Sequence, residues 1–261
     1  MQSIEKILFH EPYGVLSLTG GGGKTSLLFQ LARQLARSGK RVLTTTTTKI
    51  FAPTPEQSQM LLIAVDPEAI LLQASCALHT TNHITAAAYN LDTGKLQGFA
   101  PEAIRIFRES GLFDWILVEA DGAAGRPLKA PAGHEPVIPS ATSVLVAVAG
   151  LEAIGEPLTE ELVFRSALAG PLMGLATGET ITEAALARLF AHPLGSFKGA
   201  PAQARRYIFL NKADDTKRRE SGARIAAQLR MLDHPIAEAL IVGQALGRIR
   251  VHAVHTLAVP V

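Results

Sequence analysis

The chain has 261 residues and a nearly balanced charge, with 25 lysines and arginines against 23 aspartates and glutamates. A chain of this length buries enough surface to fold without disulfides, and its single cysteine, Cys76, excludes an internal disulfide and a cysteine-based metal site. The scattered basic residues do not indicate a nucleic-acid partner. No apolar run reaches the roughly 20 residues of a membrane-spanning helix. We therefore expect a cytoplasmic protein without a signal peptide or a membrane partner.

The first part of the chain predicts a strand, a helix and a second strand. Residues 14–19 form a short apolar run that is typical of a buried strand. Leucines at helical spacing in residues 25–37 predict a helix that ends before Gly39. The β-branched residues 41–47 predict the next strand. Two strands joined through a helix should be parallel, with a right-handed crossover.

The rest of the chain continues this alternation. We expect strands at residues 61–65, 84–88, 114–122, 144–149, 207–210 and 240–242, a hairpin turn at 90–94, and helices that begin at Pro55 and Pro67 or span about 101–110, 159–168, 182–190 and 216–232. Thr180 and Glu183 are spaced as a capping box for the helix at 182–190. The aliphatic-rich composition, 48% hydrophobic and 5% aromatic, also favours an α/β protein. We predict a single domain over residues 1–261, with a doubly wound, mostly parallel sheet and a helical insertion at about 155–200.

A glycine-rich segment lies between the first predicted strand and the first predicted helix. It consists of Gly20, Gly21, Gly22, Gly23, Lys24, Thr25 and Ser26. Glycines leave no Cβ to obstruct their amides, so several N–H groups can converge on a phosphate at the N-terminus of the helix. Lys24 can reach the β- and γ-phosphates, and the hydroxyl of Thr25 can bind Mg²⁺. Strand, loop and helix together predict a P-loop.

The loop departs from the usual P-loop pattern at its start, because Leu18 stands where the first glycine is expected. It resembles the variant found in the P-loop NTPase class that includes signal recognition particle GTPases, MinD and dethiobiotin synthetase. This resemblance implies Mg²⁺ and GTP or ATP as cofactors. Thr19 stands where the dimerising ATPases of that class carry a signature lysine, so their trans-lysine mechanism is not expected here.

Two carboxylates, Glu119 and Asp121, end the apolar run that starts at Trp115. The carboxyl ends of parallel strands open onto the ligand crevice of such a sheet, and the period of two would place both acids on the same side. The pair fits a Walker B role, in which one acid holds Mg²⁺ and the other orients the attacking water. The sequence does not assign the two roles. The alternative is a pair of solvated acids at a strand end.

A second polar segment, Asn211, Lys212 and Asp214, follows the strand predicted at 207–210. GTPases read guanine with an Asn-Lys-x-Asp arrangement, in which the aspartate accepts two hydrogen bonds that adenine cannot donate. Adenine would leave this buried acceptor unpaired, so such a site discriminates strongly against adenine. The segment therefore favours GTP over ATP. The alternative is a polar turn between a strand and a helix.

Two further segments have weaker signals. Thr47, Thr48 and Lys49 end the second predicted strand and could form a switch, with hydroxyls near Mg²⁺ and the lysine near the γ-phosphate. The threonines could equally reflect β-propensity alone. Arg126 and Lys129 lie in a loop rich in glycine and proline, which is typical of a lid or substrate loop.

These segments resemble the YqeC-like family of selenium-dependent molybdenum hydroxylase accessory proteins. The similarity rests on residues 19–25, 44–50, 118–129, 195–201 and 210–214. The resemblance implies a role in the maturation of molybdenum hydroxylases, with a molybdoenzyme or its cofactor-maturation proteins as partners. No cysteine constellation is present to handle selenium directly.

The sequence therefore predicts a Mg²⁺-dependent nucleoside triphosphatase whose hydrolysis gates a maturation step. Two alternatives remain open. One is a phosphoryl- or nucleotidyl-transferase in which the loop at 126–129 and Lys198 hold an acceptor. The other is a nucleotide-binding scaffold that changes shape and hydrolyses little.

Overall fold

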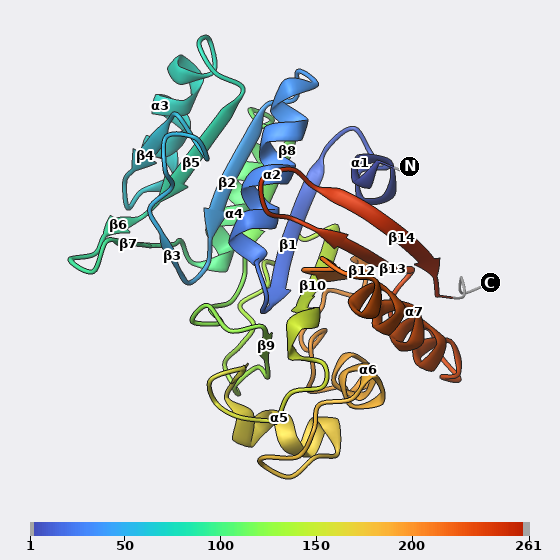
Figure 1. Cartoon of the computed structure of the whole chain (residues 1–261). Helices are drawn as coiled ribbons and strands as arrows, with labels where there is room; N and C mark the ends of the chain where they lie inside the picture. The colour runs from blue at the N-terminus through green and yellow to red at the C-terminus, as the bar shows by residue number, and fades with distance from the viewer. Residues whose placement is uncertain (1–2, 258–261) are drawn as a thin grey trace.

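The computed structural model describes residues 3–257, which contain a nine-stranded central sheet with helices on both faces (Figure 1). The strands are β1 (Gly14–Gly20), β2 (Val42–Thr46), β4 (Leu61–Ile63), β5 (His83–Ala87), β8 (Trp115–Glu119), β10 (Val144–Gly150), β12 (Arg205–Asn211), β13 (Ala239–Gln244) and β14 (Arg250–Thr256). Their order is β14-β13-β12-β10-β1-β8-β2-β5-β4, and β14 alone runs antiparallel to its neighbour among these nine strands. The predicted doubly wound, mostly parallel α/β sheet is confirmed.

Successive side chains of a strand point to opposite faces of the sheet, and helices cover the apolar side chains on both faces. The helices are α1 (Ile4–Leu8), α2 (Lys24–Arg37), α3 (Pro67–Ala77), α4 (Pro101–Glu109), α5 (Ser166–Met173), α6 (Glu183–Ala191) and α7 (Thr216–Arg230). Leu16 and Leu18 of β1 share a buried cluster with α1 and α2. Val15 faces the other way, into a cluster with α3 and α4. The helices α5, α6 and α7 cover that second face over β10, β12 and β13.

The carboxyl ends of the central strands meet at one edge of the sheet. Glu119, the last residue of β8, pairs in register with Leu18 of β1 on one side and with Thr46 of β2 on the other. Gly150 of β10 pairs in the same way with Asn211 of β12. The glycine-rich loop after β1 therefore lies between the ends of β8 and β10.

Two small sheets lie near this edge. The first contains β3 (Lys49–Phe51), β7 (Lys95–Gln97) and β6 (Tyr89–Asn90), all antiparallel. It includes the hairpin expected around residues 90–94. The second pairs β9 (Leu128–Lys129) with β11 (Val163–Phe164). In Figure 1 the first small sheet extends from the end of β2, and β9 lies below β10 near α5.

The helix predicted at 159–168 is wrong over most of its length. Arg165 has a φ of 63°, in the left-handed region, so no helix can run through it. The carboxylate of Glu160 instead accepts the backbone N–H groups of Arg165 and Ser166, and α5 begins only at Ser166. Before it, residues 163–164 form β11. The segment between β10 and β12 also contains a 3₁₀ turn (Leu151–Ala153) and α6.

Three further details differ from the sequence prediction. Thr182, not Thr180, caps α6, because its hydroxyl accepts the N–H of Ala185 at 3.2 Å. Residues 54–58 form a single turn and no helix begins at Pro55. The prediction also missed α1 and the edge strand β14. No helix within residues 3–257 is both long and apolar enough to cross a membrane.

Candidate functional site

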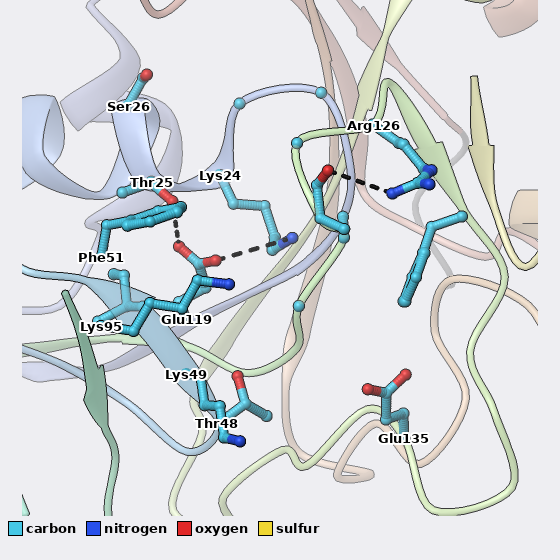
Figure 2. Close-up of a pocket in the computed structure, with 18 of the residues that line it drawn as sticks. Lys24, Thr25, Ser26, Thr48, Lys49, Phe51, Lys95, Glu119, Arg126 and Glu135 are labelled. Carbon is cyan, nitrogen blue, oxygen red and sulfur yellow. Dashed lines mark hydrogen bonds and ion pairs between the residues drawn. The ribbon is translucent and has the colours of Figure 1, made fainter. Parts of the chain in front are cut away.

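A cavity of about 770 Å³ opens at the carboxyl edge of the sheet, in front of the glycine-rich loop (Figure 2). The cavity lining includes ten of the residues singled out in the sequence: Gly22, Gly23, Lys24, Thr25, Ser26, Thr48, Lys49, Glu119, Arg126 and Lys212. The other singled-out residues lie outside the lining: Gly20, Gly21, Thr47, Asp121, Lys129, Asn211 and Asp214. The topology thus brings four separate sequence segments to one cavity.

The backbone of the glycine-rich loop is tightly constrained. Gly20 has a φ of 92°, and a Cβ there would lie 2.2 Å from the carbonyl oxygen of Val148. The N–H of Gly21 donates to that carbonyl at 2.9 Å, and the N–H of Gly22 donates to the carbonyl of Arg126 at 2.9 Å. The first intrahelical bond of α2 runs from Leu27 to Gly23. The preceding amides of α2 have no partner within the helix, which makes the helix start a ready anion site.

Lys24 lies buried between two carboxylates. Its Nζ is 3.1 Å from Asp121 Oδ1 and 4.0 Å from Glu119 Oε1, and it donates to the carbonyl of Gly20 at 2.5 Å. Burial lowers the pKa of an ammonium group, but the attraction of Asp121 and Glu119 outweighs it and raises the pKa of Lys24. The buried side chain of Lys24 therefore stays protonated, beside the anion site at the start of α2.

Glu119 and Thr25 meet at the cavity wall. The hydroxyl of Thr25 donates to Glu119 Oε2 at 2.7 Å, as the dashed line in Figure 2 shows. Burial raises the pKa of Glu119, although Lys24 and Thr25 oppose the rise. A hydroxyl and a carboxylate are the hard oxygen ligands that Mg²⁺ prefers. Within residues 3–257, no group of three or more histidine, cysteine or acidic side chains is arranged so that it could hold a metal ion by itself.

Asp121 lies behind the loop. It follows the end of β8, so the period of two no longer fixes its side, and it is 2% exposed. Its Oδ2 accepts the N–H of Gly20 at 3.0 Å and lies 3.4 Å from Lys129. Both acids contact Lys24, but only Glu119 reaches the cavity. Glu119 therefore faces the cavity, whereas Asp121 contacts Lys24 from behind the loop.

Further ion pairs extend from Asp121. Lys129, predicted to lie in a substrate loop, is buried, and its Nζ lies 2.7 Å from Glu135 Oε2. Glu135 also pairs with Arg165. Burial alone would raise the pKa of Glu135, but its bonds to Arg165 and Lys129 lower it to about 2. Glu135, which the sequence places in a loop after a glycine, and Arg165, which no sequence motif marks, both line the cavity.

The segment predicted to read the base is divided in the structure. Asn211 is buried: its amide donates to the carbonyl of Gly22 at 2.7 Å and its oxygen accepts the N–H of Ala245 at 2.9 Å. Lys212 lines the cavity and pairs with Glu152. The carboxylate of Asp214 is 53% exposed and bonds to Arg218 and Gln244.

The threonine run largely supports the backbone. The hydroxyl of Thr46 donates to the carbonyl of Glu119, and that of Thr47 donates to the carbonyl of Val137, both at 2.7 Å. Of the predicted switch residues, Thr48 and Lys49 line the cavity. Lys198 donates to the carbonyls of Ala132 and Gly133 and does not line the cavity, so it is not placed to hold an acceptor there.

The profile of the YqeC protein family matches residues 16–167. The chain belongs to the YqeC family. It is 41% identical over 198 residues to the protein YqeC of Escherichia coli (strain K12), a match that covers 76% of this chain and 75% of that relative. The part that matches the YqeC profile contains the glycine-rich loop, Glu119, Glu135 and Arg165. It ends before Asn211.

Solved structures with a related arrangement are more distant. Chloroplast FtsY from Physcomitrella patens has a TM-score of 0.47 and 16% identity, over 97% of this chain and 66% of that chain, just under two thirds of its length. The MinC:MinD complex of Aquifex aeolicus has a TM-score of 0.43 and 14% identity, over 88% of this YqeC family member and 81% of that chain.

Proposed function

We propose that this protein binds a Mg²⁺–nucleoside triphosphate at the glycine-rich loop and hydrolyses it. The observation that supports the proposal is the contact between Thr25 and Glu119, a hydroxyl and a carboxylate of the kind that binds Mg²⁺, beside Lys24 and the start of α2. A phosphate chain needs this combination of N–H donors, a cation and a metal.

In this proposal the residues of the site have three separate roles: binding phosphate, holding the metal and positioning Lys24. The amides at the start of α2 and Lys24 bind phosphate oxygens, and Thr25 and Glu119 hold the metal. Bound Mg²⁺ would neutralise charge on the transferred phosphoryl group. Asp121 acts as a positioning residue, because it holds Lys24 in place from behind the loop.

The test uses Lys24→Gln, which removes the charge but keeps a polar side chain of similar length. Calorimetric titration with Mg²⁺–GTP and Mg²⁺–ATP should show a loss of affinity of at least tenfold, because charge-assisted hydrogen bonds contribute about 1.5–3 kcal/mol. Lys217→Gln, on the exposed face of α7, is the matched control. Equal affinity for the triphosphate in wild type and Lys24→Gln, with both folded by circular dichroism, would contradict the proposal.

We propose further that GTP is preferred over ATP. The support is the position of Asn211 at the loop and the exposed carboxylate of Asp214 at the end of the same segment. Guanine would replace Gln244 and Arg218 as the donor to Asp214. We expect GTP to bind at least tenfold more tightly than ATP, and Asp214→Asn to shift the preference to xanthosine triphosphate, because an amide can donate to the extra carbonyl of xanthine. Equal binding of all three nucleotides to both proteins would refute the base assignment.

The resemblance to selenium-dependent molybdenum hydroxylase accessory proteins leads us to propose a maturation role for this NTPase. The only cysteine of the chain, Cys76, lies exposed on α3 and does not line the cavity, which favours a nucleotide-driven step over direct carriage of selenium. Cells that carry Lys24→Gln in place of the wild-type protein should accumulate molybdenum hydroxylase with reduced activity. Full activity in those cells would refute this role.

A second candidate function, transfer to an acceptor, has one observation in its favour. Lys49, Lys95 and Arg126 line the same cavity with no carboxylate within 4.0 Å in the described part of the chain. Hydrolysis alone does not need these cations. Mass spectrometry of reaction mixtures with candidate acceptors would distinguish a transferred group from free phosphate.

A further inference from the structure

One side of the cavity, formed by β3 and β7, combines an exposed aromatic ring with two lysines. Phe51 lines the cavity and is 65% exposed. The Nζ of Lys95 lies 4.8 Å from the centre of its ring. Lys49 lies two residues before Phe51 on β3. Figure 2 shows Phe51, Lys95 and Lys49 grouped at the cavity on the side of Thr25 and Glu119.

A second pairing of cation and ring joins the segment that follows β8 to β11. The guanidinium of Arg126 is 5.4 Å from the centre of the Phe164 ring, and both residues line the cavity. In Figure 2, Arg126 lies across the cavity from Phe51. We use the term cationic wall for Lys49, Phe51, Lys95 and Arg126.

The cationic wall differs from the nucleotide-binding residues in how its charge is balanced. Lys24, Lys212 and Arg165 each form an ion pair with a carboxylate. Within residues 3–257, no carboxylate oxygen lies within 4.0 Å of the charged nitrogens of Lys49, Lys95 or Arg126. Arg126 donates to the backbone carbonyls of Glu160 and Ala124, which leave its positive charge uncompensated. Three cations without a carboxylate partner favour a ligand with a doubly charged anion, such as a phosphate ester. The exposed face of Phe51 favours a planar ring that stacks on it.

We propose that the cationic wall binds a second substrate, a phosphorylated heteroaromatic compound, beside the triphosphate. The ring of this substrate stacks on Phe51, and its phosphate lies among Lys49, Lys95 and Arg126. The proposal rests on the proposed function, because it reserves the glycine-rich loop for the nucleotide. The protein would then hold two ligands in one cavity, the triphosphate at the glycine-rich loop and the phosphorylated ring compound at the cationic wall.

The test uses flavin mononucleotide as a phosphorylated heteroaromatic probe and riboflavin as its uncharged counterpart. The protein is first saturated with Mg²⁺ and a non-hydrolysable GTP analogue, and flavin binding is followed by fluorescence anisotropy. We expect saturable binding of flavin mononucleotide and at least tenfold weaker binding of riboflavin. Phe51→Leu and Lys95→Gln should each weaken the binding of flavin mononucleotide at least fivefold, and by more than any change in their affinity for the GTP analogue.

Two matched controls separate the wall from general surface effects. Tyr13→Leu removes another exposed ring under a cation, since Arg108 lies 4.3 Å from the Tyr13 ring outside the cavity, and Lys217→Gln removes an exposed charge. Neither should affect flavin binding. No binding of flavin mononucleotide, binding that Phe51→Leu and Lys95→Gln leave unchanged, or displacement of the flavin by the GTP analogue would each overturn the proposal. Failure of the wild-type protein to bind the analogue would instead refute the nucleotide site, and the flavin titration is then repeated on the protein alone.

Discussion

The two buried carboxylates beside Lys24 have different surroundings, and this difference gives them different roles. Glu119 contacts Thr25 at the cavity, whereas Asp121 bonds to the Gly20 amide and Lys129 behind the loop. Burial raises the pKa of Glu119, which shows that its charge is costly where it lies. Asp121 contacts two buried cations, so its charge compensates theirs.

We therefore expect the two amide substitutions to affect different quantities, Mg²⁺-dependent nucleotide affinity in one case and stability in the other. Glu119→Gln should leave the free energy of unfolding nearly unchanged but abolish the dependence of nucleotide affinity on Mg²⁺. Asp121→Asn should reduce the free energy of unfolding by about 1–3 kcal/mol, because it leaves Lys24 with only Glu119, at 4.0 Å, and Lys129 with only Glu135, at 2.7 Å. Urea unfolding and calorimetric titration with and without Mg²⁺ measure both quantities. The same pattern in both variants would contradict the assignment.

Sequence alone indicated the cavity residues that local spacing marks. The glycines, Lys24 and Thr25 lie within one loop, and Glu119 marks the end of an apolar run. The pairing of Glu135 with Arg165 could not be predicted, because the two residues are 30 positions apart in the chain and meet only near the place where β9 pairs with β11. The cationic wall was missed for the same reason, since Phe51 and Lys95 come from two strands of a small sheet that no motif marks.

At the scale of elements, the end of β12 is joined to the glycine-rich loop through one side chain. Asn211 bonds to Gly22 and to Ala245, which follows β13. Asn211→Ala leaves a buried carbonyl and a buried N–H without partners, so we expect the free energy of unfolding to fall by about 1–3 kcal/mol and nucleotide affinity to fall with it. The measurements are urea unfolding and calorimetry.

The control is Gln203→Ala, which removes a hydrogen bond of similar length, 2.8 Å to the carbonyl of Ser140, at an exposed position. It should change the free energy of unfolding by less than about 0.5 kcal/mol. Equal losses in the two variants would show that Asn211 has no special role in connecting the two elements.

The elements that the sequence predicted well are those with a strong period or a clear start. The helix α3 begins where Asp66 precedes Pro67, and its carboxylate accepts the N–H of Glu68. The start of α5 could not be predicted, because it depends on the left-handed Arg165 and on the carboxylate of Glu160. The strand β14 was missed because its exposed and half-buried residues include two histidines and an arginine, which hide the apolar alternation.

At the scale of the whole molecule, alternating charges connect the glycine-rich loop to the helical segment after β10. Glu119, Lys24, Asp121, Lys129, Glu135 and Arg165 follow one another in contact. This arrangement joins α2, β8, β9 and the start of α5. The sequence predicted parallel neighbours for β1, but not that β8 and β10 would flank it, because strand order depends on tertiary packing.

The pKa of Glu135 predicts how stability depends on pH. Its pKa in the folded protein, about 2, lies below the ordinary value of 4.5, so its ion pairs stabilise the fold fully above pH 4.5. This stabilisation is lost as the pH falls from about 4.5 to about 2. Glu135→Gln should be less stable than wild type at pH 7, and the difference in the free energy of unfolding should shrink as the pH approaches 2. A constant difference from pH 7 to pH 3, measured by urea unfolding, would contradict the assignment.

The N–H of Gly22 in the glycine-rich loop already donates to the carbonyl oxygen of Arg126, so this donor is occupied by the protein itself. A phosphate oxygen that takes this N–H must displace the carbonyl, and the segment from Gly122 to Arg126 then loses an anchor. Deuterium exchange in peptides that cover residues 122–129 should therefore become faster when nucleotide binds, while exchange at the start of α2 becomes slower. Unchanged exchange at 122–129 would mean that the phosphates bind without displacing that carbonyl. Faster exchange would make this segment the part of the protein that signals an occupied site to its surroundings.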